Sequence, residues 1–404
     1  MLKLLFHAAV AVLMVATWLD RTLRPALRFP RDPKQLGQRQ AWCINTLTDA
    51  GLVPIGSQVS AFAVVPFKTD AAFRSLCASL DIDVVARDGQ KQHLALLAKF
   101  APPANNLRDH AIFILQDNHR KEVGVYRHLG TDPHIALPKA YFAETQGAAG
   151  NLCLLLERMQ GAVEVSERAG CPVELCDVAV DALATLHAAF WERNDDPRTA
   201  FLPLIPDQVI DFMATLFQGP DRALFAQLLQ SVWRHDKQAP TTVLHGDARV
   251  GNMLFAPTDG TGRFVLVDWQ AARKGKGVFD LAYFLVLSVE PTVRRAHAER
   301  LLDRYHAALL AGGVQGYSRQ TLRDDYHFSC LLTLAFVSLP LLSAESSATA
   351  ANAAGLSDLG EVWTRRMAAL VDDFDFAWIQ THTGLDAGDV RAAFARTQVP
   401  QLAE

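Results

Sequence analysis

The sequence lacks a surplus of either charge, a paired cysteine spacing and the common nucleotide-binding and protease motifs. Its 39 Lys and Arg residues face 43 Asp and Glu residues, so no nucleic-acid partner is expected. Six cysteines are scattered without a CxxC pair, which argues against a disulfide scaffold or a zinc site and fits a reducing, cytoplasmic compartment. The motifs GxxxxGK followed by Ser or Thr, GxGxxG, HExxH and GxSxG are absent, which disfavours P-loop, Rossmann, zincin and serine-hydrolase chemistry.

Long apolar runs are also scarce, and the one near the start of the chain is short. Leu4–Leu19 contains 16 mostly apolar residues, with Lys3 before it and Arg21, Arg24 and Arg28 after it. A helix that crosses a bilayer needs about 20 such residues. Three alternatives stay open: an anchor in which residues 4–19 touch a membrane, a helix packed against the protein, or a cleaved signal. The sequence indicates no oligomeric state.

Half of the residues are hydrophobic, enough for a sizeable core. We expect an extension and linker over 1–34, a strand-rich lobe over 35–157 and a helical lobe over 158–404. This order favours an α+β, bilobal fold. The sequence predicts helices over 34–52, 107–129, 173–191, 207–235 (interrupted near Gly219) and from 280 onward. It predicts strands over 60–65, 76–86, 93–100 and 152–156, a hairpin of 243–255 with 263–267, and a loop over 344–357.

Chemistry concentrates in the stretch from Val243 to Asp280. Asp247 and Asp268 each follow an apolar strand, and Asn252 lies five residues after Asp247. Phosphoryl transfer uses one carboxylate to accept the proton of the attacking hydroxyl, and a second carboxylate with an amide oxygen to hold Mg²⁺. Asp247 fits the first role, and Asp268 and Asn252 fit the second. Arg249 is expected to meet the transferring phosphoryl group, since a guanidinium suits phosphate oxygens.

The sequence HGDARVGNMLF, followed by VDWQ and DLAYFL, resembles the catalytic and metal loops of the aminoglycoside and choline phosphotransferase superfamily. These proteins have the protein-kinase-like fold, and the block is most similar to ecdysteroid kinase-like phosphotransferases. The resemblance implies ATP and Mg²⁺ as cofactors. It also implies that Asp280 braces the catalytic loop. Among the candidate catalytic residues, His245 is expected to be a packed organiser of this loop, with a role as proton donor as the alternative.

The same resemblance implies a nucleotide-binding set in the strand-rich lobe. Lys99, at the end of LALLAKF, fits the lysine that grips the ATP phosphates, and Glu122 fits the helical partner that orients it. Glu157 and Met159, directly after LCLLL, correspond to the hinge whose backbone groups hold the adenine edge. The loop 67–75 departs from the family, because it contains no glycine to cover the phosphates.

The expected acceptor is the hydroxyl of a small molecule. Only 11 residues separate Asp268 from Asp280, too few for the segment that positions a peptide. The stretches 326–342 and 359–374 are apolar, which favours a neutral or lipophilic alcohol over a polycation as the acceptor. The alternative is that these two stretches are simply core helices. Two other functions stay open: a pseudokinase scaffold, suggested by the glycine-free loop, and a metal-dependent hydrolase using Asp247, Asp268 and His245.

Overall fold

The structure, a computed structural model, describes residues 10–16, 18–19, 28–67, 75–101, 117–147, 150–215, 217, 219–237, 240–257, 263–345 and 356–396. The chain divides into two compact units. Unit 1 comprises residues 1–163 and 254–272, and unit 2 comprises residues 164–253 and 273–404. The first division thus lies a few residues beyond the expected one at 157, and the segment 254–272 belongs with the strand-rich unit.

Unit 1 is built on a five-stranded sheet in the order β1-β2-β3-β5-β4, in which all neighbours pair antiparallel. The strands are β1 (Gln58–Phe67), β2 (Leu76–Val85), β3 (Lys91–Phe100), β4 (Ala140–Gln146) and β5 (Asn151–Glu157). The four strands expected from the sequence are confirmed, and β4 is an addition. Residues 86–90 join β2 to β3 through a tight turn at Gly89, whose φ is +83°, as the Asp-Gly pair predicts.

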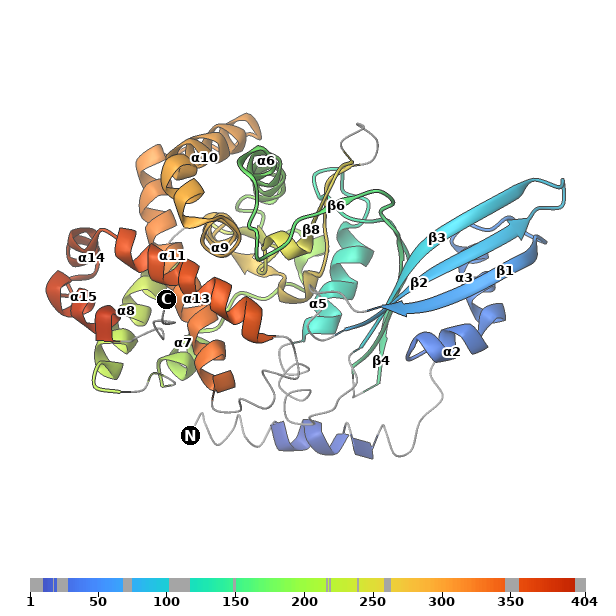
Figure 1. The fold of residues 1–404 in the computed structure, drawn as a ribbon, viewed down its shortest axis with the longest axis horizontal. Coiled ribbons are helices and arrows are strands. Elements are labelled where there is room, and N and C mark those ends of the chain that lie inside the picture. The colour runs from blue at the N-terminus through green and yellow to red at the C-terminus, as the bar shows by residue number, and fades with distance from the viewer. Residues whose placement is uncertain are drawn as a thin grey trace. The chain divides into compact units, whose positions relative to one another are not determined.

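Two short helices, α2 (Pro33–Gln38) and α3 (Gln40–Asp49), cover one face of this sheet. Figure 1 shows them beside β1 and β2. The prediction of a single helix over 34–52 is therefore wrong in one respect. The helix is interrupted at Arg39, whose φ of −111° is not helical. Asp32 begins α2 by accepting the amide of Gln35, and Pro33 occupies the first helical position, where no amide is needed.

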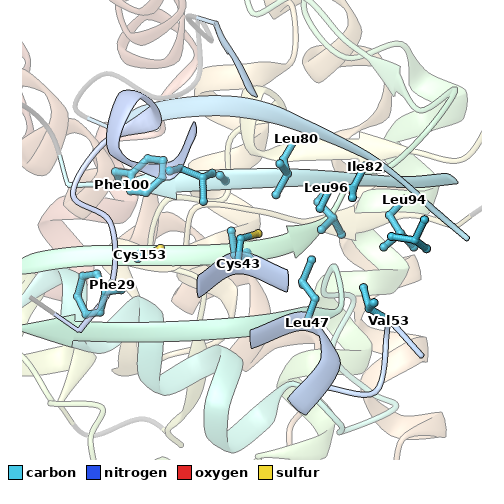
Figure 2. Packing of buried hydrophobic residues seen from close by; sticks show 14 residues of the cluster. Phe29, Cys43, Leu47, Val53, Leu80, Ile82, Leu94, Leu96, Phe100 and Cys153 are labelled. Carbon is cyan, nitrogen blue, oxygen red and sulfur yellow. The ribbon is translucent and has the colours of Figure 1, made fainter. Parts of the chain in front are cut away.

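The core of unit 1 lies between α3 and the sheet. In β2, the buried residues Leu80 and Ile82 alternate with Asp81 and Asp83, so one face of the strand is apolar and the other carries charge. Figure 2 shows Cys43 and Leu47 of α3 directed at the apolar face. The cluster also contains Phe29, Leu36, Val53, Val84, Leu94, Leu96, Ala98, Phe100, Cys153 and Leu155.

The helix expected over 107–129 is described only in its second half, since residues 102–116 lie outside the described residues. Helix α5 (Asn118–Gly124) continues into a π-helical turn, η1 (Val125–Leu129). Gly130 follows, and its Cβ position would meet the carbonyl oxygen of Tyr126. The predicted helix is thus confirmed over 118–129.

Unit 2 is mostly helical, as expected. Its helices are α6 (Val173–Ala189), η2 (Pro197–Thr199), α7 (Asp207–Ala214), α8 (Arg222–Asp236), η3 (Val250–Asn252), α9 (Val278–Ser288), α10 (Pro291–Ala311), α11 (Arg319–Glu345), α13 (Leu356–Asp373), α14 (Phe376–Thr383) and α15 (Ala387–Arg396). The loop expected over 344–357 begins and ends in α11 and α13, and its residues 346–355 lie outside the described residues.

The hairpin expected from 243–255 and 263–267 is divided among more strands than predicted. Strand β7 (Thr242–Leu244) pairs antiparallel with β10 (Arg273–Gly275). Strands β8 (Met253–Phe255) and β9 (Val265–Leu266) are neighbours in a second sheet, together with β6 (Val163–Glu164). The helical turns η3 and η4 (Trp269–Ala271) flank β8 and β9. The prediction of strand over 243–255 is therefore wrong for its central part. Residues 245–252 form a loop that ends in the helical turn η3.

Residues 10–16 and 18–19 are helical. Among the described parts of the chain, no helix combines the length and the apolar character that crossing a membrane requires.

We predict that Leu47→Ala destabilises unit 1. Leu47 is fully buried between α3 and the sheet, so its truncation leaves a cavity and lowers the free energy of unfolding by about 2–5 kcal/mol. Chemical unfolding followed by circular dichroism measures this loss. The matched control is Val65→Ala, because Val65 on β1 is 56% exposed and its truncation should change stability by less than about 0.5 kcal/mol. Equal losses for both variants would contradict the packing of α3 on the sheet.

Candidate functional site

Unit 1 brings together three of the residues singled out by sequence. Lys99 lies on β3, Glu122 on α5, and Asp268 follows β9. The Nζ of Lys99 donates to Glu122 Oε1 at 2.7 Å and to Asp268 Oδ1 at 3.0 Å. Residues separated by up to 169 positions in the chain therefore converge on one ammonium group.

Burial strengthens the electrostatic interactions among Lys99, Glu122 and Asp268. Glu122 is fully buried, and the Lys99 side chain is 6% exposed. Burial alone would lower the pKa of Lys99, but the charges of Asp268 and Glu122 outweigh it and raise that pKa. Burial also raises the pKa of Glu122 to about 7, against the opposing charge of Lys99. Lys99 is therefore a permanent cation whose position is fixed by two carboxylates.

Asp268 adopts a backbone conformation that L-residues other than Gly, Asn and Asp rarely use. Its φ is 65° and its ψ is 64°, in the left-handed region that a short polar side chain tolerates. The following η4 is anchored, because the fully buried Trp269 donates its indole N–H to the carbonyl of Leu266 at 3.0 Å. The strand end and this turn together set the direction of the Asp268 carboxylate.

The expected hinge residues Glu157 and Met159 lie at the end of β5, beside a hollow of about 370 Å³ within unit 1. The Glu157 carboxylate accepts from the Arg263 guanidinium at 2.8 Å and from the Lys139 amide at 3.0 Å. Hydrogen bonds from Arg263 lower the pKa of Glu157 despite its partial burial. The amide of Arg158 donates to the carbonyl of Ala95 on β3 at 3.4 Å. The Glu157 side chain thus fastens the hinge, and adenine binding by the hinge backbone stays a prediction.

Unit 2 brings together His245, Asp247, Arg249 and Asn252, all in the loop after β7. Asp280, in the first turn of α9, holds the start of this loop. Its carboxylate accepts the amides of His245 at 2.6 Å and Gly246 at 2.9 Å. Gly246 has a φ of +80°, which glycine adopts without strain. The contact expected of Asp280 is thus present.

A ring nitrogen of His187 lies 3.3 Å from the Asp280 carboxylate. Burial would raise the pKa of Asp280, but its hydrogen bond with His187 and the charges around it keep that pKa below its ordinary value. His187 itself is fully buried and also bonded to the Tyr305 hydroxyl at 2.8 Å. Asp280 is therefore a buried anion that holds the start of the loop through two backbone amides.

The rest of the loop is held amide by amide. The Asp247 amide donates to His245 Nδ1 at 3.3 Å, and the Val250 amide donates to the hydroxyl of Ser288 at 2.8 Å. Asn252 Nδ2 donates to the carbonyl and to the carboxylate of Asp247, at 2.8 and 3.0 Å. His245 is fully buried, and its Nδ1 accepts the Asp247 amide, a contact that helps to hold the loop.

Arg249 is buried within unit 2, and its contact with a transferring phosphoryl group stays a prediction. Its side chain is 2% exposed and donates to Glu167 Oε1 at 2.8 Å, while its Nε lies 3.5 Å from Asp247 Oδ2. The guanidinium carbon lies 5.9 Å from the ring centre of Trp363. Burial would lower the pKa of Arg249, but Asp247 and Glu167 raise it. The ion pairs described for Arg249 are with two carboxylates of its own unit, those of Glu167 and Asp247.

The residues predicted to hold Mg²⁺ fit that ion in their chemistry. Asn252 is fully buried, and no hydrogen-bond partner for its Oδ1 lies among the residues that the structure describes. An unsatisfied amide oxygen in a buried site is costly unless something binds it. Amide and carboxylate oxygens are the ligands that Mg²⁺ takes, and the Asp268 side chain is 17% exposed.

Three residues outside this loop, which sequence reasoning did not identify, contact it. Tyr283 lies three residues after Asp280 on α9, and burial together with a hydrogen bond to Asp247 raises its pKa. The i, i+3 spacing in DLAYFL could have indicated a shared helix face. Ser288 and Glu167 carried no sequence signal, since neither lies near a recognisable motif.

The comparison with protein families agrees with the resemblance inferred from the motif. A model of the ecdysteroid kinase-like family matches residues 212–312, which confirms that resemblance for the segment containing the loop. No curated protein matches the chain.

Three of the solved structures that are similar to this chain are named as a phosphotransferase or a kinase. The GDP complex of an aminoglycoside 2′-phosphotransferase-IIIa mutant is 15% identical over 80% of this chain and 98% of its own, with a TM-score of 0.49. A microcompartment-associated aminopropanol kinase is 14% identical over 78% and 93%, with a TM-score of 0.46. Choline kinase LicA from Streptococcus pneumoniae is 13% identical over 82% and 99%, with a TM-score of 0.43. These identities are too low to transfer an activity.

We predict that Asp280→Asn destabilises unit 2 in a pH-dependent manner. The folded-state pKa of Asp280 is depressed below its ordinary value of 3.8, so its stabilising contribution is complete above about pH 4 and is lost as pH falls through the folded-state pKa. Thermal unfolding from neutral to acidic pH should show a lower Tm for the variant near pH 7 and a narrowing difference below about pH 4. A constant Tm difference across this range would contradict an ionised Asp280.

Proposed function

We propose that this chain is a small-molecule kinase that uses ATP and Mg²⁺ to phosphorylate a hydroxyl group. The observation that carries the proposal is the Lys99 ammonium held by both Glu122 and Asp268. Buried charges held in this way are typical of functional sites. A second support is the HGD loop of unit 2, whose backbone is fixed around Asp247 and Asn252.

Each unit would contribute its own residues to the reaction. Asp247 would accept the proton of the acceptor hydroxyl, and its hydrogen bond from Asn252 Nδ2 at 3.0 Å orients its carboxylate. Lys99 would bind ATP phosphate oxygens, with Glu122 keeping the ammonium in place. Asp268 and Asn252 would hold Mg²⁺, which when bound neutralises charge on the phosphates. Glu157 and Met159 would present the hinge backbone to adenine.

The proposed acceptor is a neutral or lipophilic alcohol. The stretch 326–342 contains no Asp or Glu and lies in α11, and 359–374 lies largely in α13. A site for a polycationic acceptor would need several carboxylates to neutralise it. The family match supports a kinase of small molecules and leaves the acceptor open.

We predict that Asp247→Asn abolishes turnover while ATP still binds. Loss of a positioned base costs about 10²–10⁴-fold in rate, and Lys99, Glu122 and Asp268 of the nucleotide set are unchanged. Radiolabelled ATP with a panel of hydroxylated metabolites, lipophilic alcohols included, measures turnover, and a Tm titration with Mg·ATP measures binding. Asp268→Ala is the complementary variant, and it should lose the Mg²⁺-dependent part of nucleotide binding.

The same assays separate this proposal from its competitors. Wild-type turnover by Asp247→Asn on an identified acceptor would remove Asp247 from the role of base. Stabilisation of the wild-type chain by Mg·ATP without transfer to any acceptor would instead identify a pseudokinase. Metal-dependent ester cleavage without ATP would identify a hydrolase.

We also propose that residues 4–19 contact an anionic membrane surface. In the described part of this stretch, Val12, Val15 and Trp18 are 68%, 56% and 54% exposed, and their spacing of three places them on one side of a helix. Arg21 and Arg24 follow within a few residues. An exposed apolar face with adjacent arginines suits the interface of a bilayer that contains acidic lipids.

We predict that the chain sediments with vesicles of phosphatidylcholine and phosphatidylserine, and less with phosphatidylcholine alone. The double variant Val12→Glu/Val15→Glu should lose most of this binding, because carboxylates oppose both apolar insertion and the acidic lipids. The matched control is Val209→Glu on α7, whose native side chain is 42% exposed and lies outside the stretch. Unchanged sedimentation of the double variant would refute the membrane contact.

A further inference from the structure

The Arg249 guanidinium and the Glu167 carboxylate form a buried ion pair beside the catalytic loop. Their side chains are 2% and 6% exposed. Such a pair is destabilising to break, because removal of one partner leaves the other charge buried and uncompensated. The pair therefore restricts Arg249 to the interior of unit 2.

Glu167 holds more than the guanidinium. The same Oε1 atom accepts the amide of Gly251 at 2.9 Å. A Cβ atom at Gly251 would lie 2.7 Å from both Arg249 Nη1 and Glu167 Oε1, closer than any side chain tolerates. The loop therefore needs glycine at this position so that the backbone can approach the ion pair.

The segment that carries Glu167 is itself fastened to α9 and α13. The amide of Cys171 donates to the carbonyl of Ser288 at 2.6 Å, and Ser288 also accepts the Val250 amide. Arg366 of α13 donates to the carbonyl of Arg168 at 3.3 Å. The helices that support the loop therefore also fix the segment that carries Glu167. Through its ion pair, Glu167 in turn fixes the position of the Arg249 guanidinium.

We propose that Glu167 and Arg249 are a positioning pair that fixes the carboxylate of Asp247. Glu167 fixes Arg249, and the Arg249 Nε, 3.5 Å from Asp247 Oδ2, orients the base. This inference rests on the proposed function, and it replaces the expectation that Arg249 binds the transferring phosphoryl group. If Arg249 turned to a phosphate, Glu167 would lose its cation while 6% exposed.

The test compares Glu167→Gln, Arg249→Met and the double variant. Glu167→Gln leaves Arg249 in the chain, so a direct contact between Arg249 and phosphate would keep kcat near the wild-type value. A positioning pair instead predicts a loss of about 10²-fold in kcat for each single variant, as a small displacement of a catalytic group produces. The dissociation constant of Mg·ATP should stay unchanged, and the double variant should lose no more than the worse single variant.

Stability supplies a readout that separates positioning from a structural role. Each single variant should lower Tm, because one buried charge loses its closest partner, and the double variant should recover much of that loss. Its kcat should stay low, since Asp247 still lacks its contact. Gly251→Ala provides an independent variant that leaves no unpaired charge, and it should also lower kcat.

The control is Arg365→Gln on α13, which breaks a partly exposed ion pair with Glu290 and should leave kcat unchanged. Wild-type turnover by Glu167→Gln, or a double-variant loss equal to the product of the single losses, would overturn the proposal. Were the wild-type chain inactive with every acceptor, the proposed function would fail separately. The Tm comparison would then still decide the charge coupling, because it requires no substrate.

Discussion

The buried carboxylate of Asp280 is the constraint on which the loop of unit 2 depends. An ionised carboxylate without partners is strongly disfavoured in a protein interior. Asp280 escapes this by accepting two consecutive loop amides, with a ring nitrogen of His187 at 3.3 Å. Helix α9 also supplies Ser288 to the loop from its last turn. One helix thereby fixes both ends of the segment around Asp247.

Unit 1 solves a related problem with a different set of charges. Lys99 is a cation with 6% exposure, and it is tolerated because Glu122 and Asp268 surround its ammonium group. Each unit thus satisfies its buried ions from its own residues. The groups proposed to act on substrate are therefore oriented before any substrate binds, which reduces the reorganisation needed during the reaction.

Much of this arrangement could be predicted from the sequence, and the limits have physical causes. Strand-end aspartates and the HGD spacing predicted where Asp247, Asn252 and Asp268 lie relative to the strands, because local patterns fix a residue's place in its element. The pairing of β7 with β10 was missed, since register between short strands depends on long-range contacts. Glu167 was missed for the same reason: it lies 82 positions from Arg249 in the chain, within no recognisable pattern.

Arg249 shows how residue type and spacing can suggest a different partner from the one that burial selects. An arginine two positions after the aspartate proposed as the base suits a phosphate, and nothing local contradicts that expectation. The structure adds a carboxylate whose own exposure is 6%. If the Arg249 guanidinium bound a solvated ligand, it would lose its ion pair with the buried Glu167. An uncompensated buried carboxylate costs more free energy than the loss of a contact with a solvated ligand. Charge balance inside unit 2 therefore supports the positioning role that we propose for Arg249.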